Sequence, residues 1–369
     1  MNEMTSKQRF GGRLRRARLM RGLSLREVAV KLGEAGHKLS HAALQKYEKG
    51  EMGPDSQVLL ALARVFGLDA GFFFRHKAVE LGTIEFRKLT NFPQREVNRV
   101  REEAADFFEK YLQVEEILEI TVEPLLRADL SRLPADDEEA LGLATEEAAE
   151  KIREAWKLGE DAIFNVRETL EEHGIKVAEV ESPESFNGFS GWADERTPVI
   201  VLARWLDGDL PRKRLTALHE LGHLVLKLPD GISHKLKESL CYRFAGALLL
   251  PAGALRARVG TKRPDGISHR ERIGIKEDRG ISVAALMRRA KDLGIVSPAG
   301  YKSFCFQNRM NRKAEPGRWH GVEKSDRYEQ MVWRAVSQEL ITRAKAAELL
   351  DVTLRELDHL FASVAADYS

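Results

Sequence analysis

The residues of this 369-residue chain best suited to chemistry are His219, Glu220 and His223, within the sequence His-Glu-Leu-Gly-His. Two histidines four residues apart lie on the same side of a helix, so their imidazoles can bind one metal ion. A glutamate between them lies beside that ion, where it can take a proton from a metal-bound water. The pattern therefore predicts a divalent-metal site with His219 and His223 as ligands and Glu220 as the general base of a hydrolytic reaction.

The residues around this pattern favour a buried helix. Leu215, Leu218, Gly222 and Val225 recur at helical spacing and form a largely apolar face. Buried imidazoles and buried carboxylates need partners, because an unpaired buried charge is costly. A metal ion provides a partner for all three groups. The alternative, two core histidines bonded to the backbone, leaves the charge of Glu220 uncompensated.

A third ligand is expected from the following helical segment, residues 237–251. Counting by helical turns from Glu238 gives an apolar stripe that includes Cys241 and Ala245, so Glu238 would project toward the core that receives the first helix. Two imidazoles and a carboxylate suit Zn²⁺, and they also accept Mn²⁺ or Fe²⁺. The alternative for Glu238 is an ordinary position in a first helical turn, where its charge interacts with free backbone amides.

Together these motifs resemble the ImmA/IrrE family of zinc metallopeptidases. The resemblance rests on His-Glu-Leu-Gly-His at 219–223, on Glu238 six residues before Phe244-Ala245, on Leu-Leu-Leu-Pro at 248–251, and on upstream segments at 198–202 and 212–217. It implies a zincin-like domain in which His219, His223 and Glu238 bind zinc and Glu220 is the general base. The implied substrate is a protein, commonly a transcriptional repressor.

The chain departs from that family at Leu240-Cys241-Tyr242, where many relatives have Glu or Gln, then Ala, then Asn. A thiolate at Cys241 would compete for zinc, whereas a thiol one turn beyond Glu238 would pack as a small apolar residue. Tyr242, His234 and His269 are candidates to stabilise an oxyanion, although each of them taken singly is more typical of a structural residue.

The N-terminal part of the chain is strongly basic. The first fifty residues contain twelve Lys and Arg residues against four acidic residues, whereas the formal net charge of the whole chain is +2. Residues 101–182 are acidic instead. This asymmetry predicts that the N-terminal part is drawn to nucleic acid.

Residues 9–75 show short helical patterns separated by turn signals, as in a compact helical domain. Ser24 and Glu27 predict a capping box for a helix over 25–32, and Ser40 predicts the cap of the next helix. These two helices resemble the helix-turn-helix of the Xre/Cro family of repressors. The resemblance implies binding to a double-stranded DNA operator, with a homodimer on a two-fold symmetric site.

In such a domain the start of the second helix faces base edges in the major groove. The residues predicted there are Ser40, His41, Ala42, Gln45 and Lys46. The residues expected at phosphates, where they add salt-dependent affinity without sequence choice, are Arg13, Arg15, Arg18 and Arg26. The alternative is a solvated basic face on a bundle that docks protein.

The remaining patterns predict a mainly α-helical chain with a small β-sheet, an α+β fold. Helical patterns cover 95–120 and 145–172, and strand-like alternation at 175–180 and 198–202, with a turn at Asn187-Gly188, predicts a small antiparallel sheet beside the metal helices. The predicted domains are a helix-turn-helix domain (9–75), a helical linker or dimerisation region (76–150), a metallopeptidase domain (151–300) and a helical C-terminal region (301–369).

Composition favours a cytoplasmic protein without membrane contact. Two cysteines are too few for a disulfide framework, no apolar run reaches the ~20 residues of a membrane span, and the N-terminus lacks the apolar core of a secretory signal. The predicted function is a DNA-binding regulator with a zinc endopeptidase domain that cleaves a regulatory protein, such as a repressor or a toxin-associated partner encoded nearby. The alternatives are a non-proteolytic transcription factor or antitoxin that uses the zinc domain for partner binding or sensing, and a self-cleaving protein that releases its DNA-binding domain.

Overall fold

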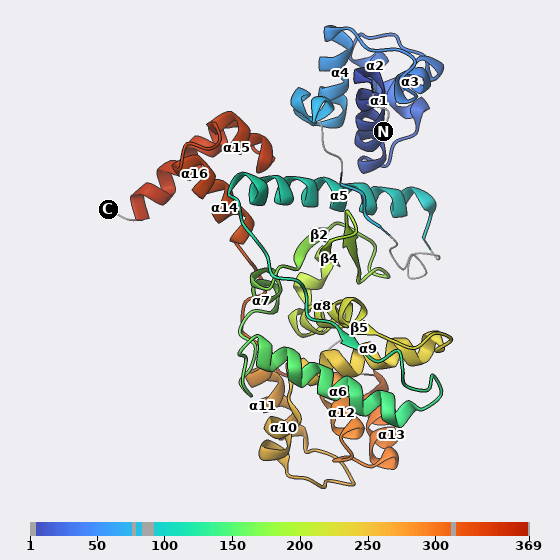
Figure 1. The fold of residues 1–369 in the computed structure, drawn as a ribbon, viewed down its shortest axis with the longest axis vertical. Helices are drawn as coiled ribbons and strands as arrows, with labels where there is room; N and C mark the ends of the chain where they lie inside the picture. Colours follow the sequence, from blue (N-terminus) through green and yellow to red (C-terminus); the bar gives the residue numbers. More distant parts are fainter. Residues whose placement is uncertain (1–4, 76–78, 83–91, 311–314, 368–369) are drawn as a thin grey trace.

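A computed structural model describes residues 5–75, 79–82, 92–310 and 315–367 of the chain. The elements form three tiers along the long axis (Figure 1): N-terminal helices, then a long helix with the C-terminal helices beside it, then a helical domain around a small sheet. This arrangement confirms the predicted α+β fold. Parts of the expected linker (76–78, 83–91) and of the expected C-terminal region (311–314, 368–369) lie outside the described residues.

The first tier, here called the N-terminal module, has a core of its own. Its capping residues act as the sequence predicts, because Ser24 and Glu27 form a capping box and Ser40 accepts a hydrogen bond from the amide of Ala43. A Cβ at Gly11 would collide with the backbone carbonyl of Tyr47, so glycine allows close packing there. The elements are α1 (Ser6–Met20), α2 (Leu25–Glu34), α3 (His41–Glu48), α4 (Ser56–Phe66) and the 3-10 helix η1 (Ala70–Phe74).

The second tier is built on α5 (Gln94–Ile117), which confirms the long helical pattern in that part of the sequence. One side of α5 packs its buried Ala104 and Phe108 against the sheet. Tyr111 and Val114 pack instead against the C-terminal helices. These helices are α14 (Arg327–Ser337), α15 (Arg343–Leu349) and α16 (Leu354–Asp367). The long helix therefore contacts both the sheet and the C-terminal helices.

The small sheet differs from its prediction. Its strands are β2 (Lys176–Val180), β3 (Gly188–Ala193) and β4 (Thr197–Ala203), in the order β2-β4-β3. β2 and β4 pair in parallel, and only β3 and β4 form an antiparallel hairpin. The antiparallel pairing predicted for the first and last strands is wrong, because Gly188 begins the unpredicted strand β3 and the tight turn falls at Asp194 and Glu195, whose φ angles are 49° and 60°.

The third tier surrounds the sheet with helices and holds the largest apolar core. The single pattern predicted at 145–172 is two helices, because the chain leaves helical geometry near Lys157 and Gly159, both with positive φ. The domain boundary expected at 150 falls inside α6, which packs on α9 in this core. The helices are α6 (Glu138–Ala155), α7 (Val166–Glu172), α8 (Leu210–Val225), α9 (His234–Leu249), α10 (Ala252–Val259), α11 (His269–Arg279), α12 (Val283–Asp292), α13 (Pro298–Gln307), η3 (Arg204–Gly208) and η4 (Asn308–Met310).

Two short strands, β1 (Ala128–Asp129) and β5 (Leu226–Lys227), pair in parallel beside α8. They bring the segment that follows α5 against the C-terminal end of α8. Across the described ranges of the chain, none of the helices combines the length and apolar character required to span a bilayer.

Candidate metal centre and nucleic-acid face

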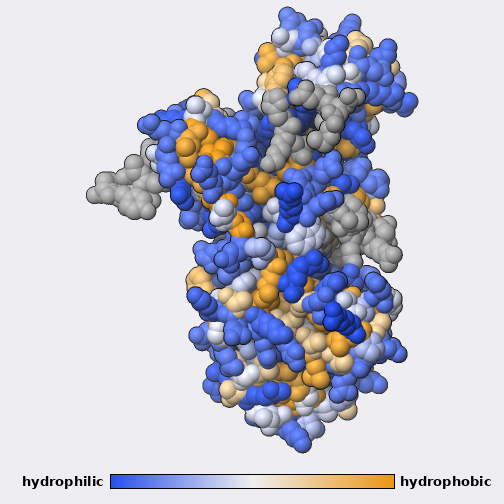
Figure 2. Space-filling model, in the orientation of Figure 1, coloured by the Kyte–Doolittle hydropathy of each residue, from blue (hydrophilic) through white to orange (hydrophobic). Residues whose placement is uncertain are grey.

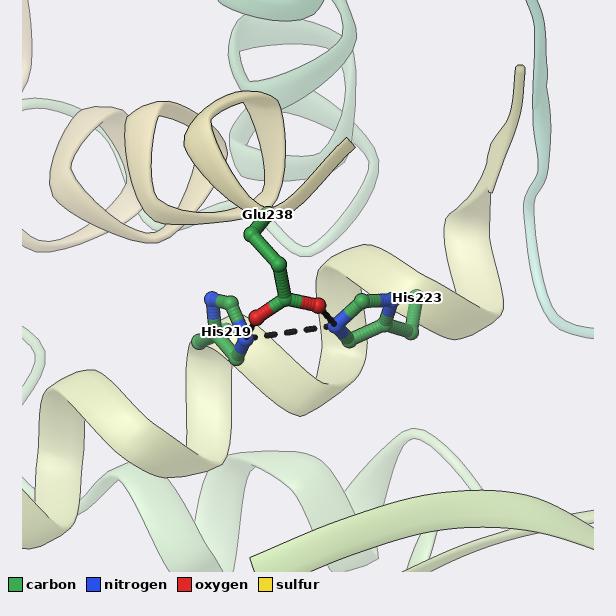
Figure 3. Close-up of side chains that lie close together, drawn as sticks. All are labelled: His219, His223 and Glu238. Carbon is green, nitrogen blue, oxygen red and sulfur yellow. Dashed lines mark hydrogen bonds and ion pairs between the residues drawn. The ribbon is translucent and has the colours of Figure 1, made fainter. Parts of the chain in front are cut away.

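The two helices α8 and α9 bring the three predicted metal ligands together. Figure 3 shows His219 and His223 on α8 with their rings directed toward the carboxylate of Glu238 on α9. The Nε2 atoms of the two histidines are 3.2 Å apart. The carboxylate oxygens of Glu238 lie 3.3 Å from Nε2 of His219 and 3.2 Å from Nε2 of His223. Among the residues whose placement is described, this is the one group of three or more His, Cys, Asp or Glu side chains that could hold a metal.

The separation of the two histidine nitrogens fits a tetrahedral metal ion, and the carboxylate lies within the same range of both. Ligand atoms about 2.0–2.1 Å from a tetrahedral ion lie about 3.3 Å from one another. The 3.2 Å between the two histidine nitrogens matches one such edge, and the carboxylate places Oε2 at 3.3 Å from Nε2 of His219 and Oε1 at 3.2 Å from Nε2 of His223. Nitrogen and oxygen donors of this kind suit zinc, and the fourth corner is left for water or a substrate atom.

The local sequence explains how the two helices position this set. Asp209 caps α8 by accepting from the amide of Arg212, and Ser233 caps α9 by accepting from the amide of Leu236. At Gly222 an added Cβ would lie 3.2 Å from Cα of Cys241, so glycine lets α9 approach α8 closely. The helices therefore pack near enough for one carboxylate to reach both imidazoles.

The environment of Glu220 suits a general base. Glu220 is 3% exposed, and its Oε2 accepts a hydrogen bond of 3.0 Å from Oγ of Ser190 on β3. This bond restricts the orientation of the carboxylate next to the metal ligands. Ser190 did not stand out in the sequence, because a lone serine in an unpredicted strand has no diagnostic spacing. The general base is therefore held by the sheet as well as by its own helix.

Three further side chains contact the ligands. Sγ of Cys241 is 3.5 Å from Nδ1 of His223, and the ring of Tyr242 lies 4.0 Å from the ring of His219 between centroids. Nε2 of His234 is 3.9 Å from the Glu238 carboxylate. His269 begins α11 and has no described contact with the three ligands. Of the residues considered for an oxyanion, Tyr242 and His234 are thus the two that the structure brings to the metal centre.

The N-terminal module presents its predicted base-reading residues to solvent. The residues Ser40, His41, Ala42, Gln45 and Lys46 are all exposed at the start of α3. Arg15 and Arg26 are exposed as well. The module lies at one end of the molecule, and the face seen in Figure 2 is mainly hydrophilic there. Exposed polar and basic side chains of this kind can form hydrogen bonds with the bases and phosphates of a DNA groove.

Arg13 and Arg18, two of the predicted phosphate contacts, have carboxylate partners within the protein. Arg13 is 4% exposed and is ion-paired at 2.8 Å with Glu109 of α5, and burial lowers the pKa of its guanidinium despite that partner. Arg18 is ion-paired at 2.6 Å with Glu48 inside the module and also donates to the carbonyl of Leu23. These intramolecular ion pairs disfavour the predicted phosphate contacts of Arg13 and Arg18, because each guanidinium already has a carboxylate partner within the protein.

Comparison with models of protein families gives two matches. Residues 14–73 match a family described as Helix-turn-helix. Residues 170–291 match a family described as IrrE N-terminal-like domain, and this range includes the three predicted metal ligands and Glu220. Comparison with curated proteins gives no match.

Proposed function

We propose that this chain, which joins an Xre-type helix-turn-helix domain to an IrrE/ImmA-like metallopeptidase domain, is a DNA-binding regulator whose second domain is a zinc-dependent endopeptidase. The observation that supports peptidase activity most directly is the convergence of His219, His223 and Glu238 within metal-binding reach of one another, beside a buried glutamate. A structural zinc site closes all four positions with protein ligands, whereas this set leaves one position open.

The residues of the site have different roles in peptide hydrolysis. His219, His223 and Glu238 would hold the ion, and zinc bound there would supply Lewis acidity. Glu220, oriented by Ser190, accepts the proton of the attacking water and delivers it to the departing amine. The burial of Glu220 keeps bulk water from competing for that proton. Mn²⁺ or Fe²⁺ would be held by the same donors.

The proposed substrate is a regulatory protein, such as a repressor or a toxin-associated partner encoded nearby. The DNA-binding domain would bring the peptidase to an operator where such proteins assemble. A single recognition helix binds weakly, so we expect two copies of the chain on a two-fold symmetric operator. The exposed start of α3 leaves the proposed reading residues accessible for that purpose.

A Glu220→Gln variant tests the proposed mechanism. The amide cannot accept the proton of water, so cleavage should fall by at least about 100-fold while the three ligands still bind zinc. Metal content and cleavage of proteins encoded beside this chain are measured together for the parent and the variant. The exposed Glu184→Gln serves as control and should cut like the parent. If Glu220→Gln cuts its partner as fast as the parent, the mechanism is wrong.

Metal sensing without cleavage is a second candidate function. It is favoured by the direct ion pairs between the N-terminal module and α5. Through these pairs, a metal-dependent change in the domain that holds α8 and α9 would reach the DNA-binding surface. Removal of the metal by a chelator should then change promoter occupancy while neighbouring gene products stay intact. Fragments of such products in the presence of metal would favour the peptidase instead, and fragments of the chain itself would indicate self-cleavage.

A further inference from the structure

The thiol of Cys241 is fully buried and adjoins the metal centre, with Sγ 3.5 Å from Nδ1 of His223. We propose that Cys241 is a positioning residue, whose sulfur accepts a hydrogen bond from Nδ1–H of His223 and thereby holds that imidazole with Nε2 facing the metal. The inference rests on the proposed zinc site.

The tautomer of His223 supports this role. A neutral imidazole carries one N–H and one lone pair, so an Nε2 that binds a metal requires the hydrogen on Nδ1. Nε2 of His223 is the atom that meets Nε2 of His219 and the carboxylate of Glu238. The Nδ1–H therefore points away from the metal and toward Sγ of Cys241. Metal-binding histidines commonly have such a second partner, which fixes the ring and its tautomer.

The packing of α8 against α9 keeps the thiol in place. Cys241 follows Glu238 by three residues, so both side chains leave nearly the same face of α9. They contact opposite nitrogens of the His223 ring, with the carboxylate at Nε2 and the thiol at Nδ1. A Cβ at Gly222 would lie 3.3 Å from Cβ of Cys241, which shows how closely the cysteine backbone is pressed against α8.

This geometry differs from both roles that the sequence suggested for Cys241. A thiolate ligand should lie among the ligand atoms, but Sγ contacts the ring nitrogen on the far side of His223 and is absent from the described metal-binding group. A packing residue would need only apolar neighbours, whereas this thiol also faces a ring nitrogen. A sulfur acceptor at this position accounts for the contact and for the complete burial.

The test measures zinc affinity of the full-length protein by competition with a chelator. Cys241→Ala removes the acceptor and should weaken zinc binding about 10-fold or more. Cys241→Ser keeps an acceptor, so its affinity should lie between the parent and the alanine variant. If Cys241 only fills space, the alanine variant should bind zinc more tightly than the serine variant, because a buried hydroxyl is tolerated less well than a methyl group. Cys305→Ala on α13 is the matched control and should bind zinc like the parent.

Cobalt substitution separates positioning from ligation. Co²⁺ bound by nitrogen and oxygen donors lacks the near-ultraviolet charge-transfer band that a thiolate ligand produces, so we expect no such band in the parent. A thiolate band that disappears in Cys241→Ala would overturn the proposal, as would unchanged zinc affinity in that variant. Thermal unfolding of the metal-free variants distinguishes a folding defect from a loss of affinity. A parent that binds neither ion would instead refute the proposed zinc site itself, and with it this inference.

Discussion

At the scale of single residues, the candidate metal centre depends on a carboxylate that bridges two imidazoles. Glu238 is the least buried of the three ligands, with 22% of its side chain exposed, and its two oxygens each approach a different histidine. Both histidines lie on α8, and Glu238 is the one residue of the set on α9, so the site is formed between the two helices. A metal ion bound there would therefore stabilise the contact between α8 and α9 as well as supply chemistry.

Replacement of Glu238 should remove the metal. Glu238→Ala takes away one of three ligands, so zinc affinity should fall by more than about 100-fold, beyond the range usual for partners outside the ligand set. Metal content after dialysis and chelator competition measure the loss. Lys235→Ala, an exposed residue in the first turn of the same helix, α9, is the control. Full zinc content in Glu238→Ala would show that the third ligand lies elsewhere.

At the scale of secondary structure, α1 and the helix-turn-helix divide the basic residues between two tasks. Arg13 and Arg16 of α1 face α5 and are ion-paired with Glu109. Arg26 on α2 is exposed instead, as a phosphate contact requires. The basic charge of the N-terminal module is therefore only partly available to DNA.

Removal of a single phosphate contact should change the salt dependence of DNA binding. Arg26→Ala should lower affinity for any duplex and reduce the slope of log K against log salt by about 1, because each phosphate contact releases about one condensed counterion. Binding to a duplex of arbitrary sequence, titrated at several salt concentrations, measures the slope. The exposed Arg256→Ala on α10 should leave it unchanged. An unaltered slope in Arg26→Ala would place Arg26 away from the phosphates.

At the scale of the whole molecule, one charged cluster joins the N-terminal module, α5 and the C-terminal helices. Arg75 is ion-paired at 2.8 Å with both Asp106 on α5 and Glu348 on α15. Lys110 of α5 is ion-paired with Asp106 and with Asp351, which follows α15. Burial alone would raise the pKa of Asp106, but the charges of Lys110 and Arg75 outweigh it and lower that pKa. The carboxylate thus stays ionised where the three parts meet.

Loss of Arg75 should loosen this junction. Arg75→Met removes one of two cationic partners from each of two largely buried carboxylates, Asp106 and Glu348, while Lys110 and Lys345 remain. The free energy of unfolding should therefore fall by about 2 kcal/mol, less than the roughly 3–5 kcal/mol expected when a buried charge loses its only partner. Denaturant titration measures the change, and hydrogen exchange should locate it at α5 and α15. Arg343→Met breaks an ion pair with Asp358 whose side chains are 65% and 58% exposed, so it should cost less than about 1 kcal/mol. Equal effects of the two substitutions would contradict a central role for Arg75.

The sequence alone was sufficient for features that depend on neighbouring residues. Helical caps at Ser24 and Ser40, the long helix α5 and the histidine pair on α8 all follow from spacings of a few residues, which local backbone geometry converts directly into structure. The strand β3, the parallel pairing of β2 with β4 and the burial of Arg13 against Glu109, 96 residues away, required the tertiary structure. The bonds of Ser190 and Cys241 to the metal centre did so too, since each joins residues on different elements. No local pattern specifies which distant segments meet, because that choice is made by packing of the whole chain.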